Sequence, residues 1–592
     1  MPEAHNIEVR AASPERIAAL VDAGTHPLLA KIYAARGIAS TEQLNTDLRG
    51  LVPVSALTNV ERMAALAADA IAAAEKLLII ADYDSDGATA CAVGVRALRA
   101  LGANVDYLVP NRFEYGYGLT PEIVALAKQT KNPDILITVD NGIASVDGVA
   151  AANALGMRVW VTDHHLPGAT LPDAQCIINP NQTGCAFPSK NLAGVGVMFY
   201  LMLALRAELR RRGWFSDRSS AASPTPLPPR EGDVEPTSGR TKRTEPNLAA
   251  LLDLVALGTV ADVVRLDDNN RLLVAQGLGR IRAGKTWPGV AALLRVAGRD
   301  PRRASTYDLG FVLGPRLNAA GRLDDMSRGI DCLISDDAVA ATRMAQELDQ
   351  LNKQRRAIES DMHEDALSKL DTLEASDDYS LCLFDQAWHQ GVIGILASRL
   401  KERLHRPVIA FARGNNGEIK GSGRSIGALH LRDALDLVTK REPDLIIRFG
   451  GHAAAAGLTL REHDLPRFRS AFEAIVRTML TPGDLDRVIT TDGPLASEQL
   501  TLETAAQLEQ GIWGQGFPAP TFCDSFDVLA QRIVGGRHLK LQLRKDDGEF
   551  EAMLFGSAAP LPARLRAVYR LAVNEYNATR RLQITIEHWH EA

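Results

Sequence analysis

Short apolar runs alternate with helix-like patterns along the first part of the chain. Three such runs, 77–81, 135–139 and 159–162, are each followed by a polar or glycine-containing turn and then by an amphipathic stretch. Repetition of strand and then helix is typical of a parallel sheet whose two faces are covered by helices. The pattern therefore predicts an α/β fold for this part of the chain.

A long helix and two further units are expected in the second half. Apolar residues recur every three or four positions after Ser335, which predicts one helix over 335–372 with Ser335 as its N-cap. Strands and helices alternate again over 373–486, so we expect a second α/β lobe, and mainly parallel sheets in both lobes. Leucines alternate with polar side chains over 538–544, which favours a small antiparallel β-barrel.

These patterns divide the chain into segments. One of them, residues 216–247, contains six prolines and only two large apolar residues, Leu227 and Val234. Such a segment cannot bury enough apolar surface to offset its chain entropy, so we predict a disordered insertion there. The expected segments are an N-terminal helical segment (1–50), a first lobe (51–334), the connecting helix (335–372), a second lobe (373–486) and a barrel (487–592).

Composition narrows the class of protein. At 592 residues the chain is too long for one core, and its 46% hydrophobic and 23% charged residues are near globular averages. The net charge of −6 gives no overall positive field, so an anionic ligand would need a local basic site. The six cysteines form no CxxC pair, and the longest apolar run, 192–205, is too short to cross a bilayer. Residues 1–15 carry no signal-peptide pattern, so we expect a soluble cytoplasmic protein that does not bind a membrane.

Four segments carry acids or histidines, in three cases directly after an apolar run. Three acids follow the run 77–81, in the sequence Asp82-Tyr83-Asp84-Ser85-Asp86-Gly87. The other segments are Asp140-Asn141-Gly142, Asp163-His164-His165 and the stretch 258–263, which contains Asp262. Taken singly, each has an ordinary structural explanation: a solvated acidic turn, an Asx turn, structural histidines or an N-cap.

Taken together, the four segments point to a metal site. The carboxyl ends of the strands of a doubly wound sheet meet at one edge, so these segments are expected to converge there. Carboxylate oxygens with one or two imidazole nitrogens suit manganese or magnesium better than zinc or copper. A carboxylate shared between two such ions is typical of two-metal hydrolases. The sequence therefore predicts a two-metal hydrolytic centre.

The same four segments resemble, in order, the four signature motifs of the DHH phosphoesterases. Five downstream stretches narrow the resemblance to the RecJ family: 110–118, 313–322, 388–394, 421–425 and 450–452. The resemblance implies a DHH lobe, a DHHA1 lobe and a C-terminal OB-fold domain. It also implies a single-stranded-DNA-specific exonuclease that degrades DNA 5′ to 3′ to mononucleotides, in recombination and repair.

The resemblance further implies roles for individual residues. His165, Asp163 and Asp140 would act in catalysis: His165 would contact the scissile phosphate, Asp163 would orient a ligating histidine, and Asp140 would bridge two ions. The two Mn²⁺ or Mg²⁺ ions would be held by Asp82, Asp84, Asp86, Asp140, His164 and Asp262. DNA would be bound by Arg112, Arg316, Asn318, Arg322, His389, Ser422, Arg424, Ser425 and His452.

Two other functions remain as alternatives. A phosphoesterase for short oligonucleotides or cyclic dinucleotides would use the same four motifs without needing the barrel. A non-catalytic DNA-binding scaffold would keep the fold after losing the metal site, although every acid and histidine of that site is present here. For the exonuclease, the expected partners are single-stranded DNA, a single-strand-binding protein and a helicase, and the expected state is a monomer.

Overall fold

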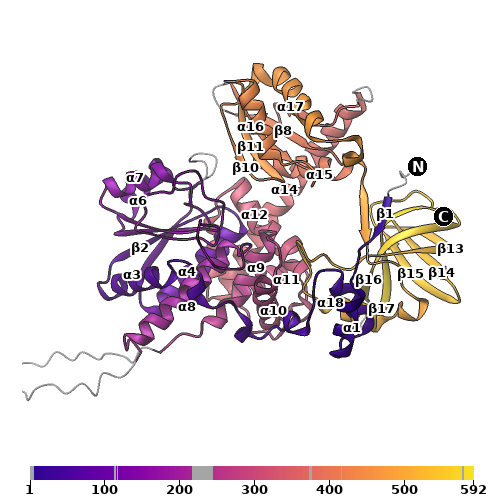
Figure 1. Cartoon of the computed structure of the whole chain (residues 1–592), viewed down its shortest axis with the longest axis horizontal. Helices are drawn as coiled ribbons and strands as arrows, with labels where there is room; N and C mark the ends of the chain where they lie inside the picture. Colours follow the sequence, from indigo (N-terminus) through magenta and orange to yellow (C-terminus); the bar gives the residue numbers. More distant parts are fainter. Residues whose placement is uncertain are drawn as a thin grey trace, which may run out of the picture. The chain divides into compact units, whose positions relative to one another are not determined.

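The computed structural model describes residues 6–111, 115, 118–215, 244–372, 377–414, 417–576 and 579–592 (Figure 1). These residues form two compact units. The first unit consists of Glu42–Gln350 with Ile512–Pro518. The second unit combines the residues up to Thr41 with Leu351–Gly511 and Ala519–Ala592. Within the described part of the chain, no helix has both the length and the apolar character needed to span a membrane.

A five-stranded parallel sheet organises the first unit. Its strand order is β3-β2-β4-β5-β6, and every neighbouring pair is parallel, as predicted. β4 is buried along its whole length, as expected for a strand covered on both faces. The strands are β2 (Lys76–Ala81), β3 (Asn104–Leu108), β4 (Ile135–Val139), β5 (Arg158–Thr162) and β6 (Cys176–Ile178).

Helices cover both faces of this sheet (Figure 1). Residues of α6 and α7 share one apolar cluster with Leu78, Leu136 and Val159 of the sheet. On the opposite face Ile79 lies against Gly94 of α4, and α3 and α8 accompany α4 there. The helices are α3 (Val60–Ala72), α4 (Ser85–Leu101), α6 (Pro121–Thr130), α7 (Val146–Ala154) and α8 (Gly194–Arg211).

A helical layer completes the first unit. Its main elements are α9 (Leu252–Ala261), α10 (Asp268–Arg282), α11 (Pro288–Val296), the π-helix η6 (Asp308–Leu313), α12 (Gly314–Leu323) and α13 (Ser327–Ile334). Short 3₁₀ helices are η1 (Thr41–Leu44), η2 (Leu48–Gly50), η3 (Val54–Ala56), η4 (Leu248–Leu251) and η5 (Pro301–Arg303). Most of the predicted insertion, residues 216–243, lies outside the described residues. Its last residue, Asn247, caps η4 by accepting a hydrogen bond from the N–H of Ala249.

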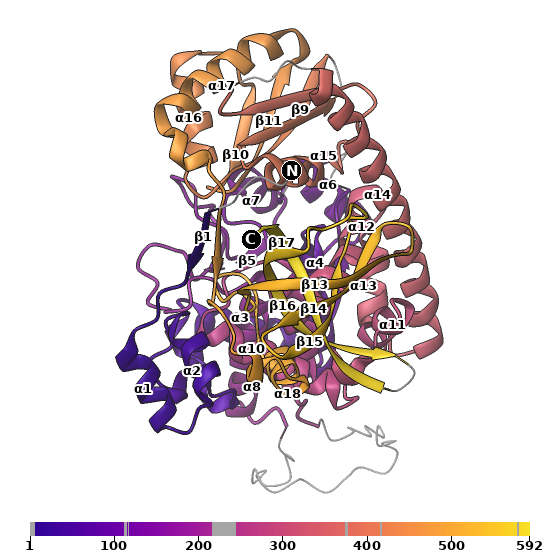
Figure 2. The same cartoon turned by 90° about the vertical axis from the view of Figure 1, so that its right-hand side faces the viewer.

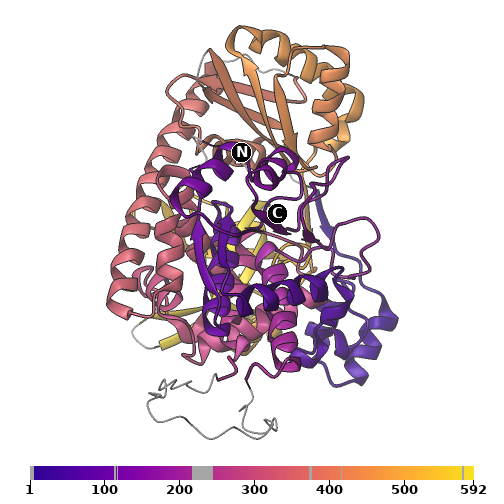
Figure 3. The same ribbon diagram turned by 90° about the vertical axis from the view of Figure 1, so that its left-hand side faces the viewer.

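The predicted connecting helix is α14 (Ala338–Thr372), which runs without interruption for 35 residues and contributes to both units (Figures 2 and 3). The prediction that Ser335 is its N-cap is wrong by two residues. Ser335 directly follows the last residue of α13, and the Asp337 carboxylate accepts the N–H of Val339 at 2.8 Å instead. The Ser335 hydroxyl accepts the N–H of Asp337 at 3.2 Å and so helps to shape the corner between the two helices.

The second lobe has a five-stranded sheet of order β10-β11-β9-β8-β7. Only β7 and β8 are parallel, so the prediction of a mainly parallel sheet is wrong for this lobe. The reason is local, because only a few residues separate β8 from β9 and β10 from β11, and strands joined by so short a connection pair as antiparallel hairpins. The elements are β7 (Leu381–Asp385), α15 (Ile393–Leu404), β8 (Val408–Arg413), β9 (Glu418–Arg424), α16 (Leu431–Arg441), β10 (Arg448–Gly451), β11 (Ala455–Arg461), η7 (Glu462–Asp464) and α17 (Leu465–Met479).

The C-terminal segment forms a closed barrel of order β13-β14-β15-β17-β16 (Figure 2). Leu539, Leu541 and Leu543 are buried in it, as the alternating pattern predicted. The barrel strands are β13 (Phe522–Val534), β14 (His538–Lys545), β15 (Gly548–Leu554), β16 (Arg564–Tyr576) and β17 (Thr579–Glu591). Before it come η8 (Pro482–Leu485), β12 (Val488–Thr491), η9 (Ser497–Gln499) and α18 (Leu502–Gln510).

The N-terminal segment contains the predicted helices, α1 (Pro14–Asp22) and α2 (Pro27–Ala34). It also contains a strand that the sequence did not predict, β1 (Asn6–Val9), which pairs in parallel with β12. A buried ion pair between Arg36 and Asp492, 2.8 Å long, supports this connection. The N-terminal segment from Asn6 onward is therefore packed against the segment that leads into the barrel.

Candidate metal centre

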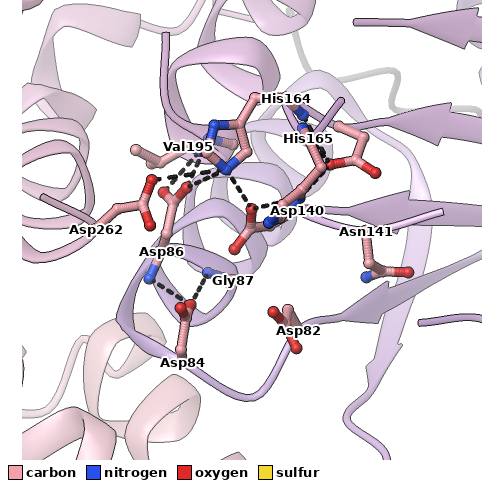
Figure 4. Close-up of polar contacts among 12 residues, drawn as sticks. Asp82, Asp84, Asp86, Gly87, Asp140, Asn141, His164, His165, Val195 and Asp262 are labelled. Atoms are coloured by element: carbon pink, nitrogen blue, oxygen red, sulfur yellow. Dashed lines mark hydrogen bonds and ion pairs between the residues drawn. The ribbon is translucent and has the colours of Figure 1, made fainter. Parts of the chain in front are cut away.

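The four predicted segments meet at one place in the first unit (Figure 4). Asp82, Asp140 and Asp163 directly follow β2, β4 and β5, so they stand at the carboxyl edge of the parallel sheet. Asp262 reaches the same place from the end of α9. The convergence expected from the strand pattern is therefore present in the fold.

His164 lies at the centre of the cluster. Its Nε2 is 3.0 Å from Asp140 Oδ1, 3.6 Å from Asp262 Oδ2 and 3.8 Å from Asp86 Oδ2. These three acids and the imidazole come from four separate segments of the chain, and Asp86 and Asp140 are almost fully buried. One imidazole nitrogen surrounded by three carboxylates is a ligand set rather than an ordinary hydrogen-bonding pattern.

The side chains divide into overlapping sets of metal-ligand geometry. Asp86, His164 and Asp262 form one set, and Asp82, Asp84 and Asp140 form another, each with donor atoms within 4.8 Å of one another. Asp140 also forms a set with His164 and His165, so it lies between the two groups. This is the position that a carboxylate bridging two cations would occupy.

The turn that carries the first three acids is closed by specific backbone contacts. Asp84 is the N-cap of α4, and its Oδ1 accepts the N–H groups of Asp86 at 2.9 Å and Gly87 at 3.0 Å. A Cβ at position 87 would lie 2.5 Å from the carbonyl oxygen of Asp82. Glycine is therefore required for the turn to fold back on itself and to place three acids on one side.

The Asp86 carboxylate is held by the start of a second helix. Its Oδ2 accepts the N–H of Gly194 at 2.6 Å, and its Oδ1 accepts the N–H of Val195 at 2.9 Å, both in the first turn of α8. A Cβ at Gly194 would lie 2.7 Å from the Cβ of Asp140, so only glycine allows this approach. Two backbone donors and the helix dipole partly offset the cost of burying this negative charge.

Crowding of the buried acids changes their protonation. Burial and the neighbouring Asp262 carboxylate raise the pKa of Asp86 to about 7. Burial and Asp84 likewise raise the pKa of Asp262 to about 7, and burial together with the surrounding acids raises the pKa of Asp140 well above its usual range. Burial lowers the pKa of His164, which favours the neutral imidazole that binds metals. Divalent cations would relieve the repulsion among these groups.

Asp163 and His165 form a separate ion pair at the edge of the cluster. The Nδ1–H of His165 donates to Asp163 Oδ1 at 2.8 Å. Although burial opposes the charge, this bond and the Asp163 charge raise the pKa of His165 to about 9. Burial alone would raise the pKa of Asp163, but the bond from His165, the two histidines and the N–H of Ile143 together lower it. Asp163 therefore orients the ring of His165, whereas we expected it behind the ligating histidine.

The residues present fit divalent cations of the Mg²⁺ or Mn²⁺ type. His164 Nε2 and Asp262 Oδ2 are buried and form no hydrogen bond within the described part of the chain. Buried polar atoms are normally paired, so two such atoms aimed at one point indicate a missing ligand. Five carboxylates and one imidazole are a hard donor set, which suits these cations better than zinc or copper.

Several supporting contacts were not predicted from the sequence, among them that of Asn318, which we expected to bind DNA. Asn181 and Asn179, which follow β6, donate to the backbone carbonyls of His164 at 2.6 Å and His165 at 2.8 Å. Asn318 Oδ1 accepts both the N–H and the hydroxyl of Ser85, at 2.7 and 2.8 Å. The asparagines after β6 repeat the pattern of polar residues at strand ends and could have been found. The contact between Asn318 and Ser85 spans 233 positions and has no local pattern.

Comparisons with known proteins agree with this arrangement. The family model for the DHH family, N-terminal domain, matches residues 76–221, the DHHA1 domain matches 377–478, and the RecJ OB domain matches 491–588. The single-stranded-DNA-specific exonuclease RecJ of Dickeya dadantii (strain 3937) is 50% identical over 575 residues, covering 95% of each chain. The chain belongs to the RecJ family. RecJ of Escherichia coli (strain K12) is 48% identical over the same share of each chain.

Solved RecJ structures support the fold and the type of ligand. RecJ of Thermus thermophilus in complex with Mn²⁺ matches with a TM-score of 0.79 and 29% identity, over 100% of this chain and 80% of that chain. Its Mg²⁺ complex matches with a TM-score of 0.73 and 28% identity, over 99% and 78%. Mn²⁺ and Mg²⁺ are the cations that the donor set of the present chain suits. The predicted fold, with DHH and DHHA1 lobes and an OB-type barrel, is confirmed.

The DNA-binding residues expected from the RecJ resemblance lie in several places. Arg112 is outside the described residues. Arg316 is engaged by the protein itself, because its guanidinium donates to Asp349 at 2.9 Å and to the carbonyl of Val312 at 2.6 Å. Asn318 contacts the acidic turn, as described above, and Arg322 is half-buried in the last turn of α12.

The remaining candidates belong to the DHHA1 lobe. Arg424 donates to the Ser422 hydroxyl at 3.1 Å, and both side chains would contact a Cβ at Gly394 of α15. Ser425 Oγ is buried and forms no hydrogen bond within the described residues. His389 Nδ1 accepts the N–H of Gly391, and His452 is exposed between β10 and β11. Ser422 and Arg424 thus form a polar pair beside the start of α15.

Proposed function

We propose that this chain is a metal-dependent exonuclease specific for single-stranded DNA, which hydrolyses phosphodiester bonds with two divalent cations. The observation that carries the proposal is the cluster in which His164 and five carboxylates share one largely buried site, with Asp140 between two ligand sets. The 50% identical relative is named as a single-stranded-DNA-specific exonuclease. Such a ligand set has little use in a protein that only binds DNA.

The ligand sets indicate which residues would bind each cation. Asp82 and Asp84 would hold one cation, Asp86, His164 and Asp262 would hold the other, and Asp140 would belong to both. Bound cations would supply Lewis-acid stabilisation of the phosphate and activation of water.

His165 is suited to the phosphate itself. Its pKa of about 9 makes it a cation at neutral pH, and Asp163 fixes its ring through Nδ1. The Nε2–H would then donate to a non-bridging phosphate oxygen as negative charge develops there. Asp163 would act as a positioning residue by holding this ring orientation.

We further propose that degradation runs 5′ to 3′ and releases mononucleotides, with the DHHA1 lobe recognising a terminal phosphate. Burial lowers the pKa of Arg424, and in the described residues no carboxylate lies within 4.0 Å of its guanidinium. A partly buried guanidinium with this environment is suited to an anion, and phosphate oxygens match its donor geometry. Ser422 and the unbonded hydroxyl of Ser425 would add donors.

The wider role also belongs to this proposal. We propose action in DNA recombination and repair in the cytoplasm, as a monomer, together with a single-strand-binding protein and a helicase. The family resemblance supports this role. Size-exclusion chromatography with light scattering tests the monomer, and co-purification with the single-strand-binding protein tests that partner.

The direct test uses end-labelled DNA. Single-stranded DNA with a 5′ or a 3′ label is incubated with Mn²⁺, Mg²⁺ or EDTA, and blunt duplex DNA serves as the control. We expect immediate release of the 5′ label as a mononucleotide, late release of the 3′ label, and no cleavage in EDTA or of duplex. Equal loss of both labels, or turnover only of dinucleotides, would favour the short-oligonucleotide phosphoesterase, and DNA binding without turnover would favour the scaffold.

A further inference from the structure

Two aromatic side chains project from the first unit into solvent. Tyr307 is 56% exposed and Phe311 is 73% exposed, and their rings are stacked with centroids 5.2 Å apart and planes 25° from parallel. Leaving two large rings in water forfeits the free energy that burying them would provide. Paired exposed rings of this kind indicate a binding surface more than a packing surface.

The element that carries them is unusual as well. Phe311 lies in the π-helix η6, and Tyr307 directly precedes it. π-helices are rare, and they occur frequently at functional sites. The two rings are exposed, whereas Gly310 between them and Gly314 after them lie against other residues of the protein.

Two glycines of this region lie against the end of α9. A Cβ on Gly310 would lie 3.1 Å from Val260 Cγ1, and a Cβ on Gly314 would lie 3.0 Å from Ala261 Cβ. Val260 and Ala261 immediately precede the metal-ligand candidate Asp262. The segment that carries the aromatic pair therefore packs against the end of the helix that leads into Asp262.

The chemistry around the pair favours nucleic acid. The Arg299 guanidinium lies 6.0 Å from the ring centroid of Tyr307, and its side chain is 46% exposed although its Nε also pairs with Asp308 at 3.2 Å. Val263, next to Asp262, is a further exposed apolar side chain, at 62%. Aromatic rings beside arginine are how proteins hold single strands without reading sequence, because every base has a face that stacks.

We propose that Tyr307 and Phe311 form a stacking platform for bases of the single-stranded substrate beside the metal centre. The proposal rests on the exonuclease function and adds a site to it. The strand that is cleaved at the metal centre must continue over the neighbouring surface, and this surface offers it two stacked rings beside the half-exposed Arg299, which is paired with Asp308. Stacking also explains a preference for single strands, since paired bases cannot present their faces to a ring.

The test combines protein and substrate changes. The double variant Tyr307→Ala/Phe311→Ala is compared with wild type on 5′-phosphorylated oligothymidylate of about 20 nucleotides, longer than a single-strand binding site usually needs. A second series of substrates carries one abasic residue at successive positions. KM and kcat are measured with Mn²⁺, and DNA affinity is measured in EDTA.

We expect the double variant to raise KM and weaken binding roughly 5- to 150-fold per lost stacking contact, with kcat changed less than about 2-fold. In wild type, abasic residues at one or two positions should raise KM, and in the double variant those positions should have no further effect. Tyr307→Trp/Phe311→Trp should retain the affinity of wild type. The control Val339→Ala, 80% exposed in the same unit, should change nothing.

Several outcomes would overturn the platform. The platform would be excluded if the double variant had the same KM and DNA affinity as wild type. That result would be expected if the two rings bind another protein instead. Equal sensitivity of both proteins to abasic residues would exclude the platform as well. Absence of cleavage by wild type would contradict the exonuclease function itself, so the two failures are distinguishable. Circular dichroism should show the same Tm for all variants, because the changed side chains are largely exposed.

Discussion

Replacing Asn318 by alanine separates a positioning role from a DNA-binding role. The Oδ1 of Asn318 accepts the N–H and the hydroxyl of Ser85, the first residue of α4 and a neighbour of Asp84 and Asp86. Helix α12, which carries Asn318, approaches the acidic turn again at Gly321, where a Cβ would overlap the carbonyl oxygen of Tyr83. Asn318 is therefore expected to hold the acidic turn in place rather than to contact DNA.

The size of the effect follows from the lost acceptor. Ser85 is 1% exposed, so its N–H cannot turn to water, whereas its hydroxyl can still donate to the carbonyl of Gly314 at 3.0 Å. An unsatisfied buried donor costs about 1–3 kcal/mol. Expressed fully in metal affinity, this corresponds to roughly 5- to 150-fold weaker Mn²⁺ binding. We expect the cost to be divided between stability and metal affinity.

The assay measures three quantities in Asn318→Ala: Mn²⁺ affinity by electron paramagnetic resonance, single-stranded DNA affinity in EDTA, and Tm. The control is Asn352→Ala, which removes a buried asparagine that accepts from Arg355 at 2.7 Å and lies outside the metal centre. Both variants should lose stability, and only Asn318→Ala should lose Mn²⁺ affinity. Unchanged Mn²⁺ affinity with weaker DNA binding would refute the positioning role.

Three further predictions follow from the site. Asp140→Asn removes the carboxylate between the two ligand sets and should lower kcat more than about 100-fold. Tm should change little, because asparagine tolerates the backbone φ of +62° at this position. Near-normal turnover would exclude the bridging role. In the metal-free protein the raised pKa values of Asp86 and Asp262 should reduce stability increasingly from about pH 4 to about pH 7, because a carboxyl with a raised pKa disfavours the folded state above its unfolded pKa. Mn²⁺ should therefore raise Tm more near pH 8 than near pH 5.5, as calorimetry would show, and an equal gain would contradict the repulsion. Arg424→Ala should raise KM roughly 10- to 150-fold for 5′-phosphorylated strands and much less for 5′-hydroxyl strands; equal effects on both substrates would rule out recognition of the terminal phosphate.

Local patterns predicted the parts of the site that local structure determines. Asp82, Asp140 and Asp163 were found because each follows an apolar strand, and parallel strands end at the same edge. The alternation of leucines at 539, 541 and 543 likewise predicted the buried face of a barrel strand. Nothing beyond the immediate neighbours was needed for these predictions.

Contacts between residues far apart in the chain could not be predicted from the sequence. No local pattern shows that Gly194 and Val195 donate their N–H groups to the carboxylate of Asp86, which lies 108 and 109 positions earlier in the chain. Nor does one show that Asp349 engages the guanidinium of Arg316. The antiparallel sheet of the DHHA1 lobe was missed for a different reason, because apolar runs alone do not distinguish a hairpin turn from a helical crossover.

The most direct test of the metal centre is anomalous diffraction from crystals of this chain grown with Mn²⁺. The ligand sets predict two manganese peaks in the first unit, one beside Asp82 and Asp84, the other beside Asp86, His164 and Asp262, with Asp140 coordinating both. A single peak, or two peaks that Asp140 does not join, would contradict the shared-carboxylate arrangement on which the proposed hydrolysis depends.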